Sequence, residues 1–433
     1  MKTLSTSIFF KRFVIPTTIA ACLLGTLSIA RAIETAKPAS VGISAAKVQD
    51  FKVELQRRVD AGEIPGAVLL VLKNGKIAVQ EAIGFRDRLN AAHMAMDTIF
   101  PIASMTKPIV AVAVMRLVEQ GKLSLSDPLS NYIPEFKTTK VGVEKINAEG
   151  KSELELVNAS REITIQDLMR HTSGLTYGYF DNTLVDKIYL DNNIYDQNQS
   201  LEQQTSKLAT LPLKYQPGST WNYGLSFDVL GRVIEVITKQ SLDQALKELV
   251  TGPLDMKDTN FWVDESKYSR VAYSSVPPSK WKYTPLKTKP NLLSGGIGMS
   301  STAKDYARFC QMLLNKGQLE GTRVLSRKSV ELMTSNHLPP GVQAVKVPSS
   351  WANFAPRFES GLGFGLGFAV RTEQGRGALL GSSGEYFWLG ASGTNFVIDP
   401  MEKMITILMI AQSDKGLENL QLMRNMGSAL IDD

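Results

Sequence analysis

Ser44, Ser104 and Ser301 are among the serines of the chain that are followed by a lysine three residues later. A serine hydroxyl beside a lysine amine can perform acyl transfer, because a neutral amine takes the serine proton as the oxygen attacks a carbonyl carbon. Ser44 and Ser301 have a simpler explanation, since both precede predicted helices. Next to Ser301, Thr302 and Asp305 form the pattern of a capping box. Ser104 is therefore the candidate nucleophile.

The segment after Ser104 predicts a helix that is apolar on every side, which is typical of a buried helix. Residues 109–115 are all apolar, and Pro108 restricts the helix start to the region of Ser104. Ser104 and Lys107 then share one helix face. Burial lowers the pKa of a lysine, so the Lys107 amine can act as a base toward the serine hydroxyl. On these residues alone, a capping serine with a lysine that extends to solvent remains an alternative.

A second polar group is expected at Tyr223. Residues 217–225 (PGSTWNYGL) form a predicted turn that leads into the helix SFDVLGRVIEVI. A lone tyrosine in such a place is usually a packed aromatic residue with a satisfied hydroxyl. The residues alone therefore leave the role of Tyr223 open.

Several other kinds of catalytic site are absent from the sequence. No serine lies in the G-x-S-x-G pattern of the α/β-hydrolases, and the nearest segment is 224–228. The three histidines, His93, His171 and His337, form no zinc-binding pattern with each other or with cysteine. We expect neither a metal site nor a cofactor.

Four segments, in chain order, resemble one protein family. They are IASMTKPIVAVAVMRLVEQGKLSLSDPL, DLMRHTSGLTYG, QPGSTWNYGLSFDVLGRVIEV and SGGIGMSSTAKDYARFCQMLLNKG. The family comprises the serine β-lactamases of the class C type, the DD-peptidases and the related family VIII carboxylesterases. The resemblance runs from about residue 41 to residue 412 and implies the β-lactamase/DD-peptidase-like α/β fold.

The resemblance assigns roles to individual residues. It implies that Ser104 is the nucleophile and that Lys107 and Tyr223 share the general-base and general-acid work. The backbone N–H groups of Ser104 and Ala391 would form the oxyanion hole. His171 begins a family signature over residues 171–174, and we favour a structural role for it.

Two departures from the family pattern concern the substrate. Leu225 stands where the β-lactamases carry asparagine, and Trp388 and Leu389 replace the usual cation and hydroxyl that help to hold a carboxylate. Trp388 and Gly390 fit the Trp-Gly-Gly pattern of the esterases, whereas Leu389 does not. With Leu225, Trp388, Leu389 and Gly390 as substrate-binding residues, the sequence favours a carboxylesterase for small, fairly apolar esters. A β-lactamase or D-amino-acid peptidase or amidase, and a non-catalytic binding module, remain alternatives.

The elements that must position these residues are predicted from both ends of the chain. A helix from Ser44 to about Asp60, a hairpin with an Asn74-Gly75 turn, late strands in GFGLGFAVR, GTNFVID and MITILMIAQ, and a closing helix predict an antiparallel sheet flanked by the terminal helices. This sheet lobe would comprise residues 41–97 and 336–433. Residues 98–335 would form a mainly helical inserted lobe, in which residues 181–206 are a long loop or short helices. Together they predict a single domain over residues 33–433.

The N-terminal residues predict export, and we do not expect them to be part of the fold. Residues 1–32 have a basic start, an apolar stretch and an Ala30-Arg31-Ala32 cleavage site, the pattern of a signal peptide. A lipid anchor through Cys22 is a less favoured alternative. Cleavage removes four basic residues and no acidic ones, so the net charge of +6 falls to about +2. We therefore expect a periplasmic or secreted protein with a small ester or amide substrate, no nucleic-acid partner and no stable membrane span. Cys310, in an apolar helical run, would be a buried, inert thiol.

Overall fold

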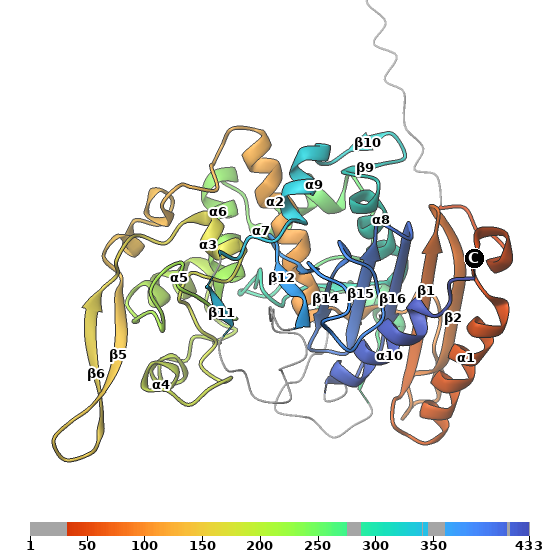
Figure 1. Ribbon diagram of the computed structural model, residues 1–433, viewed down its shortest axis with the longest axis horizontal. Coiled ribbons are helices and arrows are strands. Elements are labelled where there is room, and N and C mark those ends of the chain that lie inside the picture. Colours follow the sequence, from red (N-terminus) through yellow and green to blue (C-terminus); the bar gives the residue numbers. More distant parts are fainter. Residues whose placement is uncertain (1–32, 275–286, 340, 345–359, 414–415, 433) are drawn as a thin grey trace, which may run out of the picture. The chain divides into compact units, whose positions relative to one another are not determined.

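The computed structural model describes residues 33–274, 287–339, 341–344, 360–413 and 416–432, shown in Figure 1. Residues from Ala32 onward form one compact unit. The predicted signal peptide, with Cys22, lies outside the described residues. Within the described ranges, no helix is both long enough and apolar enough to cross a membrane.

The helices and strands have the following bounds. The α-helices are α1 (Ala45–Asp60), α2 (Thr106–Glu119), α3 (Ile165–Met169), α4 (Leu184–Asp191), α5 (Leu201–Ala209), α6 (Ser226–Thr238), α7 (Leu242–Leu246), α8 (Ala303–Leu314), α9 (Arg327–Met333) and α10 (Gly416–Ser428). The strands are β1 (Gly66–Lys73), β2 (Lys76–Asp87), β3 (Ala92–His93), β4 (Phe100–Pro101), β5 (Lys140–Ile146), β6 (Ser152–Asn158), β7 (Thr220–Trp221), β8 (Ser300–Ser301), β9 (Gln318–Leu319), β10 (Thr322–Arg323), β11 (Gln343–Ala344), β12 (Leu362–Phe364), β13 (Ala369–Arg371), β14 (Tyr386–Gly390), β15 (Thr394–Asp399) and β16 (Met404–Met409).

Both ends of the chain build one antiparallel sheet, in the strand order β12-β13-β14-β15-β16-β1-β2-β3 (Figure 1). The N-terminal hairpin β1–β2 joins the last strand β16, where Leu70 lies opposite Ile407. Every residue of β1 is buried, which explains its continuous apolar sequence from Gly66 to Leu72. Asn74 and Gly75 have φ angles of 53° and 76°, as a tight two-residue hairpin turn requires. The prediction of a sheet assembled from both termini is confirmed.

The two faces of this sheet are covered by different helices (Figure 1). On one face, α10 packs against β14, β15 and β16 and also contacts α1. There the guanidinium carbon of Arg424 lies 4.4 Å from the ring centroid of Phe387. On the other face, Tyr306 of α8 lies against Phe396 of β15, with 5.0 Å between the ring centroids. Residues of even number on β14 and β15 therefore lie on the face of the sheet that carries α8, and residues of odd number lie on the face that α10 covers.

Helix α2 forms the buried centre of the helical lobe. Its residues from Thr106 to Met115 are all buried, as the run of apolar residues predicted. It packs against α6, α7 and η5 (Lys247–Thr251). η5 is a π-helix, so α7 is followed directly by a wider helical turn.

The segment GFGLGFAVR was predicted as one strand, and this prediction is wrong. It folds into the antiparallel pair β12 and β13, with Phe364 opposite Ala369. Gly367 between them has a φ of 91°, which lets the chain reverse. A Cβ atom at Gly365 would lie 2.1 Å from the carbonyl oxygen of Met333, so only glycine allows this close packing.

Residues 181–206 contain two short helices, α4 and α5, instead of one long loop. Each begins with a complete capping box, Thr183 with Asp186 in α4 and Ser200 with Gln203 in α5. Within the helical lobe, β5 and β6 form an antiparallel hairpin, which extends outward in Figure 1.

Candidate active site

Ser104 lies in a short turn that the surrounding backbone holds from several sides. It belongs to the 3-10 turn η2 (Ala103–Met105), immediately before α2. Ala103 has a φ of 41°, an unfavourable value for a residue with a side chain, directly before the candidate nucleophile. The amide of Ile102 donates to the carbonyl of Met299 at 3.0 Å, and the Met299 amide donates to Thr106 Oγ1 at 3.1 Å. These bonds fix the position of the Ser104 hydroxyl.

Lys107 places its amine beside that hydroxyl. Its Nζ lies 3.1 Å from Ser104 Oγ and donates to the carbonyl of Gly296 at 2.9 Å. Only 1% of Lys107 is exposed. This burial lowers the pKa of Lys107 from 10.5 to about 7, against the opposing attraction of Asp228. Near neutral pH a large fraction of Lys107 is therefore an uncharged amine, which can accept the serine proton.

Tyr223 reaches the same place from the turn before α6. The side-chain amide of Asn222 donates to the carbonyl of Leu175 at 2.8 Å, which anchors the turn. A Cβ atom at Gly224 would lie 2.3 Å from that carbonyl oxygen, so glycine permits the close approach. The Tyr223 ring centroid lies 4.6 Å from Lys107 Nζ. The structure thus brings Ser104, Lys107 and Tyr223 together.

Aromatic side chains surround Tyr223. Five rings lie within 6.0 Å of the Tyr223 ring, centroid to centroid: His171, Tyr177, Phe180, Trp221 and Trp388. The His171 ring is completely buried, and burial holds its pKa well below the usual value, so the imidazole is neutral. His171 therefore packs here as an uncharged ring, in keeping with the structural role favoured from the sequence.

The end of β14 lies against the chain just before Ser104. A Cβ atom at Gly390 would lie 2.2 Å from the carbonyl oxygen of Ile102. Two residues later, the Ser392 hydroxyl donates to the carbonyl of Pro101. These contacts set the position of Ala391, the residue between them, relative to the Ser104 turn.

Replacing Gly390 by alanine is expected to lower kcat by about one to three orders of magnitude, because β14 must move away from Ile102 and carries the Ala391 amide with it. Steady-state kinetics with an ester substrate checks this. Gly416→Ala is the control, since a Cβ atom at Gly416 meets open space. Unchanged kcat in Gly390→Ala would mean that β14 does not position the site.

The remaining predicted substrate-binding residues lie in different places. Trp388 faces Tyr223, with 5.6 Å between the ring centroids. The regular pairing of β14 with β15 places Leu389 on the same face as Phe387, toward α10 and away from Trp388. Leu225 is buried at the start of α6.

Two arginines that could have supplied a cation to the site are bound elsewhere. Arg371 is buried and donates from Nε to Glu385 Oε1 at 2.6 Å. Arg376 pairs with Glu373 at 2.7 Å. Both guanidinium groups are therefore paired with carboxylates of the chain itself.

Two residues that influence Lys107 were not predicted from the sequence. Gly296 supplies the carbonyl that accepts from Lys107, and it lies 189 residues further along the chain. Asp228 is a buried acid in α6, and its negative charge raises the pKa of Lys107. Of the two, only Asp228 could have been noticed in the sequence, because it is an acidic residue in the otherwise mainly apolar start of the segment SFDVLGRVIEVI.

The Thr302 cap of α8 is confirmed, but the reciprocal half of the predicted capping box is not. Thr302 Oγ1 accepts from the Asp305 amide at 3.1 Å. The Asp305 carboxylate instead accepts from the Asp258 amide at 2.7 Å and from Thr259 Oγ1 at 3.0 Å. Ser301 Oγ lies 2.7 Å from Thr259 Oγ1, so this serine is a structural residue.

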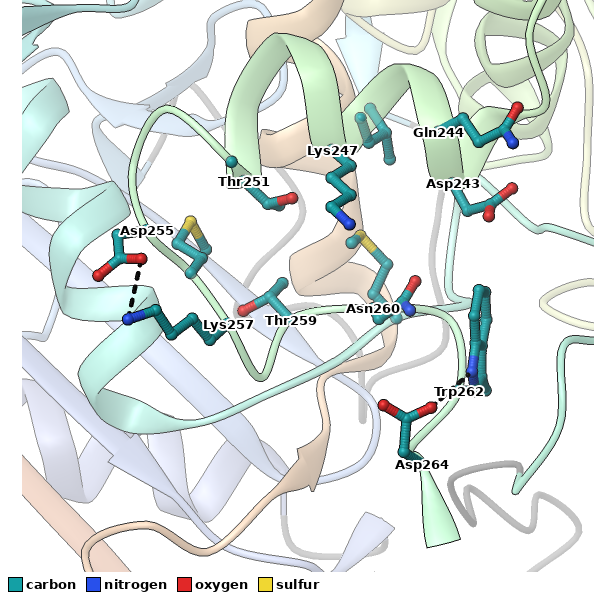
Figure 2. Close-up of a pocket in the computed structure, with 14 residues that line it drawn as sticks. Asp243, Gln244, Lys247, Thr251, Asp255, Lys257, Thr259, Asn260, Trp262 and Asp264 are labelled. Carbon is teal, nitrogen blue, oxygen red and sulfur yellow. Dashed lines mark hydrogen bonds and ion pairs between the residues drawn. The ribbon is translucent and has the colours of Figure 1, made fainter. Parts of the chain in front are cut away.

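A separate pocket of about 480 Å³ lies between α7, η5 and the chain around Thr259 (Figure 2). Its lining includes Trp262, whose indole N–H donates to Asp264, and the ion pair of Lys257 with Asp255 at 3.2 Å. It contains none of the site residues predicted from the sequence. In the described part of the chain, no group of histidine, cysteine and acidic side chains could hold a metal ion.

Comparisons with known proteins show which family the chain resembles. A family model described as beta-lactamase matches residues 51–426. Protein Rv1367c of Mycobacterium tuberculosis is 36% identical over 361 residues, covering 81% of this chain and 86% of that protein. Esterase EstB of Burkholderia gladioli is 29% identical over 383 residues, with 81% and 87% covered.

Among solved structures, EstCE1, a hydrolase with promiscuous acyltransferase activity, superposes with a TM-score of 0.71 at 24% identity, covering 88% of this chain and 99% of EstCE1. That likeness concerns the fold. The β-lactamase/DD-peptidase-like fold expected from the sequence is confirmed.

Proposed function

The chain belongs to the beta-lactamase family of serine hydrolases, and from this premise we propose that it hydrolyses small, fairly apolar carboxylic esters through an acyl-enzyme on Ser104. The observation that carries the proposal is the buried Lys107 amine, which lies 3.1 Å from Ser104 Oγ. Its pKa of about 7 makes it a base that operates at neutral pH.

In the proposed reaction, Ser104 Oγ attacks the ester carbonyl carbon while its proton passes to the Lys107 amine. The backbone N–H groups of Ser104 and Ala391 hold the resulting oxyanion. The tetrahedral intermediate then expels the alcohol, which takes a proton delivered by Lys107 or Tyr223. A water molecule attacks the acyl-enzyme in the same way and releases the carboxylic acid.

The surroundings of the site favour an uncharged ester over a β-lactam. A β-lactam carries a carboxylate, and burying a carboxylate without a cation or hydrogen-bond donors costs several kcal/mol. Arg371 and Arg376 are engaged with Glu385 and Glu373. Aromatic rings and Leu225 offer apolar contact instead, which stabilises an apolar acyl group by about 25 cal/mol per Å² buried. The name of the relative EstB, an esterase, supports the same substrate class.

We expect kcat/KM for a short-chain nitrophenyl ester to exceed that for benzylpenicillin by at least about a hundredfold, which is roughly 2.7 kcal/mol in barrier height. Both substrates, and a D-Ala-D-Ala peptide, are measured on one preparation, with Ser104→Ala protein as the blank. Comparable values for the penicillin and the ester would contradict the proposal and favour a β-lactamase.

Export through residues 1–32 stays a prediction.

A further inference from the structure

Asp228 is a buried carboxylate that contacts the turn of residues 294–296. It lies in the first turn of α6 and is 2% exposed. The Ser294 hydroxyl donates to Asp228 Oδ1, and the Gly296 amide also donates to the carboxylate. Ser294 Oγ in turn accepts from the amide of Ile297 at 3.2 Å. Burial raises the pKa of Asp228, whereas the hydrogen bonds from Ser294 and Gly296 and the charge of Lys107 favour the ionised carboxylate.

Gly296 connects this carboxylate to Lys107. Its amide donates to Asp228, and its carbonyl accepts from Lys107 Nζ at 2.9 Å. A Cβ atom at Gly296 would lie 2.6 Å from Asp228 Oδ2, and a Cβ atom at Gly295 would lie 2.3 Å from the carbonyl oxygen of Phe227. The turn 294–296 is therefore pressed against α6, and Asp228 determines where the Gly296 carbonyl meets the amine.

We propose that Asp228 is a positioning residue for Lys107. Through Gly296, Asp228 holds the Lys107 amine beside Ser104, and its negative charge favours the protonated form of that amine. This inference rests on the proposed function, in which Lys107 is the base. Among the described residues, Lys107 and Asp228 form no direct ion pair. The carboxylate therefore acts across the Gly296 peptide rather than by contact.

The charge effect has a defined direction. The ionisable groups around Lys107 are Asp228, His171, Tyr177 and Tyr223. Burial lowers the pKa of Lys107 and the Asp228 anion raises it, whereas His171 is neutral and burial raises the pKa of Tyr177 well above its usual value. Removing the anion must lower the pKa of Lys107 further. The amine then remains uncharged to lower pH, so the acid limb of the kcat/KM profile moves to lower pH.

Asp228→Asn tests the proposal because it removes the charge at almost constant shape. We expect the acid limb of ester hydrolysis to move down by about one pH unit or more, and the plateau rate to fall because asparagine cannot accept both donors. Glu235→Gln is the matched control, since Glu235 is an acid on the same helix that binds Arg232 and the Leu242 amide. Its profile should match that of the wild type.

A direct titration separates this inference from the proposed function. In protein labelled with [ε-¹³C]lysine, the Lys107 resonance, assigned by its loss in Lys107→Met, should titrate at lower pH in Asp228→Asn than in the wild type. Asp228→Ser removes the same charge if the asparagine protein fails to fold. An unshifted Lys107 titration and an unshifted acid limb would overturn the inference. If the wild-type protein hydrolyses no ester, but the Lys107 titration still shifts in Asp228→Asn, the proposed function alone is refuted.

Discussion

Ser104→Ala is expected to lower the turnover of a nitrophenyl ester by about three to six orders of magnitude, because only binding and oxyanion stabilisation remain when the nucleophile is removed. The fold should not change. The Ser104 turn is held by backbone bonds of its neighbours, such as that of Ile102 to Met299, and the substitution removes one oxygen atom.

Two other serines with a lysine at the same spacing are the controls for Ser104→Ala. Ser44 caps α1 from a half-buried position, and Ser301 bonds to Thr259. Alanine at either position should leave kcat within about a factor of a few, since neither serine lies beside the Lys107 amine. Near-full activity of Ser104→Ala, confirmed by the mass of the purified protein, would contradict the assignment of the nucleophile.

Lys107→Met is expected to lower kcat by about two to four orders of magnitude, the usual contribution of a positioned acid–base group. Methionine matches the length of lysine but cannot accept the Ser104 proton. Retention of near-full activity would mean that Tyr223 or a water molecule serves as the base.

The same substitution should stabilise the protein at low pH. The folded-state pKa of Lys107 is about 7 against 10.5 unfolded, so burial of this amine costs roughly 4 kcal/mol at pH 7. The cost is fully present below pH 7 and disappears as the pH rises through 10.5. The Gly296 carbonyl loses its donor in Lys107→Met, which offsets about 1–3 kcal/mol of the gain. Thermal unfolding should therefore show a higher Tm than the wild type at pH 6, and a gain that shrinks toward pH 10.

Local patterns predicted the parts of the site that lie near each other in sequence. The apolar run in α2 and the position of Pro108 located Ser104 and Lys107, because helix geometry brings residues three apart onto one face. The Asn74-Gly75 turn and the buried strand β1 likewise follow from their own residues. The family resemblance added Tyr223 and the end of β14, which no local pattern joins to Ser104.

The contacts that tune Lys107 could not be predicted, because they join distant segments. Gly296 lies opposite Lys107 only after the turn 294–296 packs on α6, where Gly295 and Gly296 leave no room for a side chain. The break between β12 and β13 depends in the same way on Gly365 meeting Met333. The direction of Leu389 became evident only from the pairing of β14 with β15.

Labelling with a fluorophosphonate probe tests the central claim most directly, because the probe bonds to an activated serine without any knowledge of the natural substrate. Trypsin does not cleave between Lys107 and Pro108, so Ser104 falls in the peptide of residues 89–116, where it is the single serine. We expect the probe on this peptide, with labelling lost in Ser104→Ala and strongly slowed in Lys107→Met. A label on Ser44, Ser301 or any other serine, with residues 89–116 unmodified, would contradict the account.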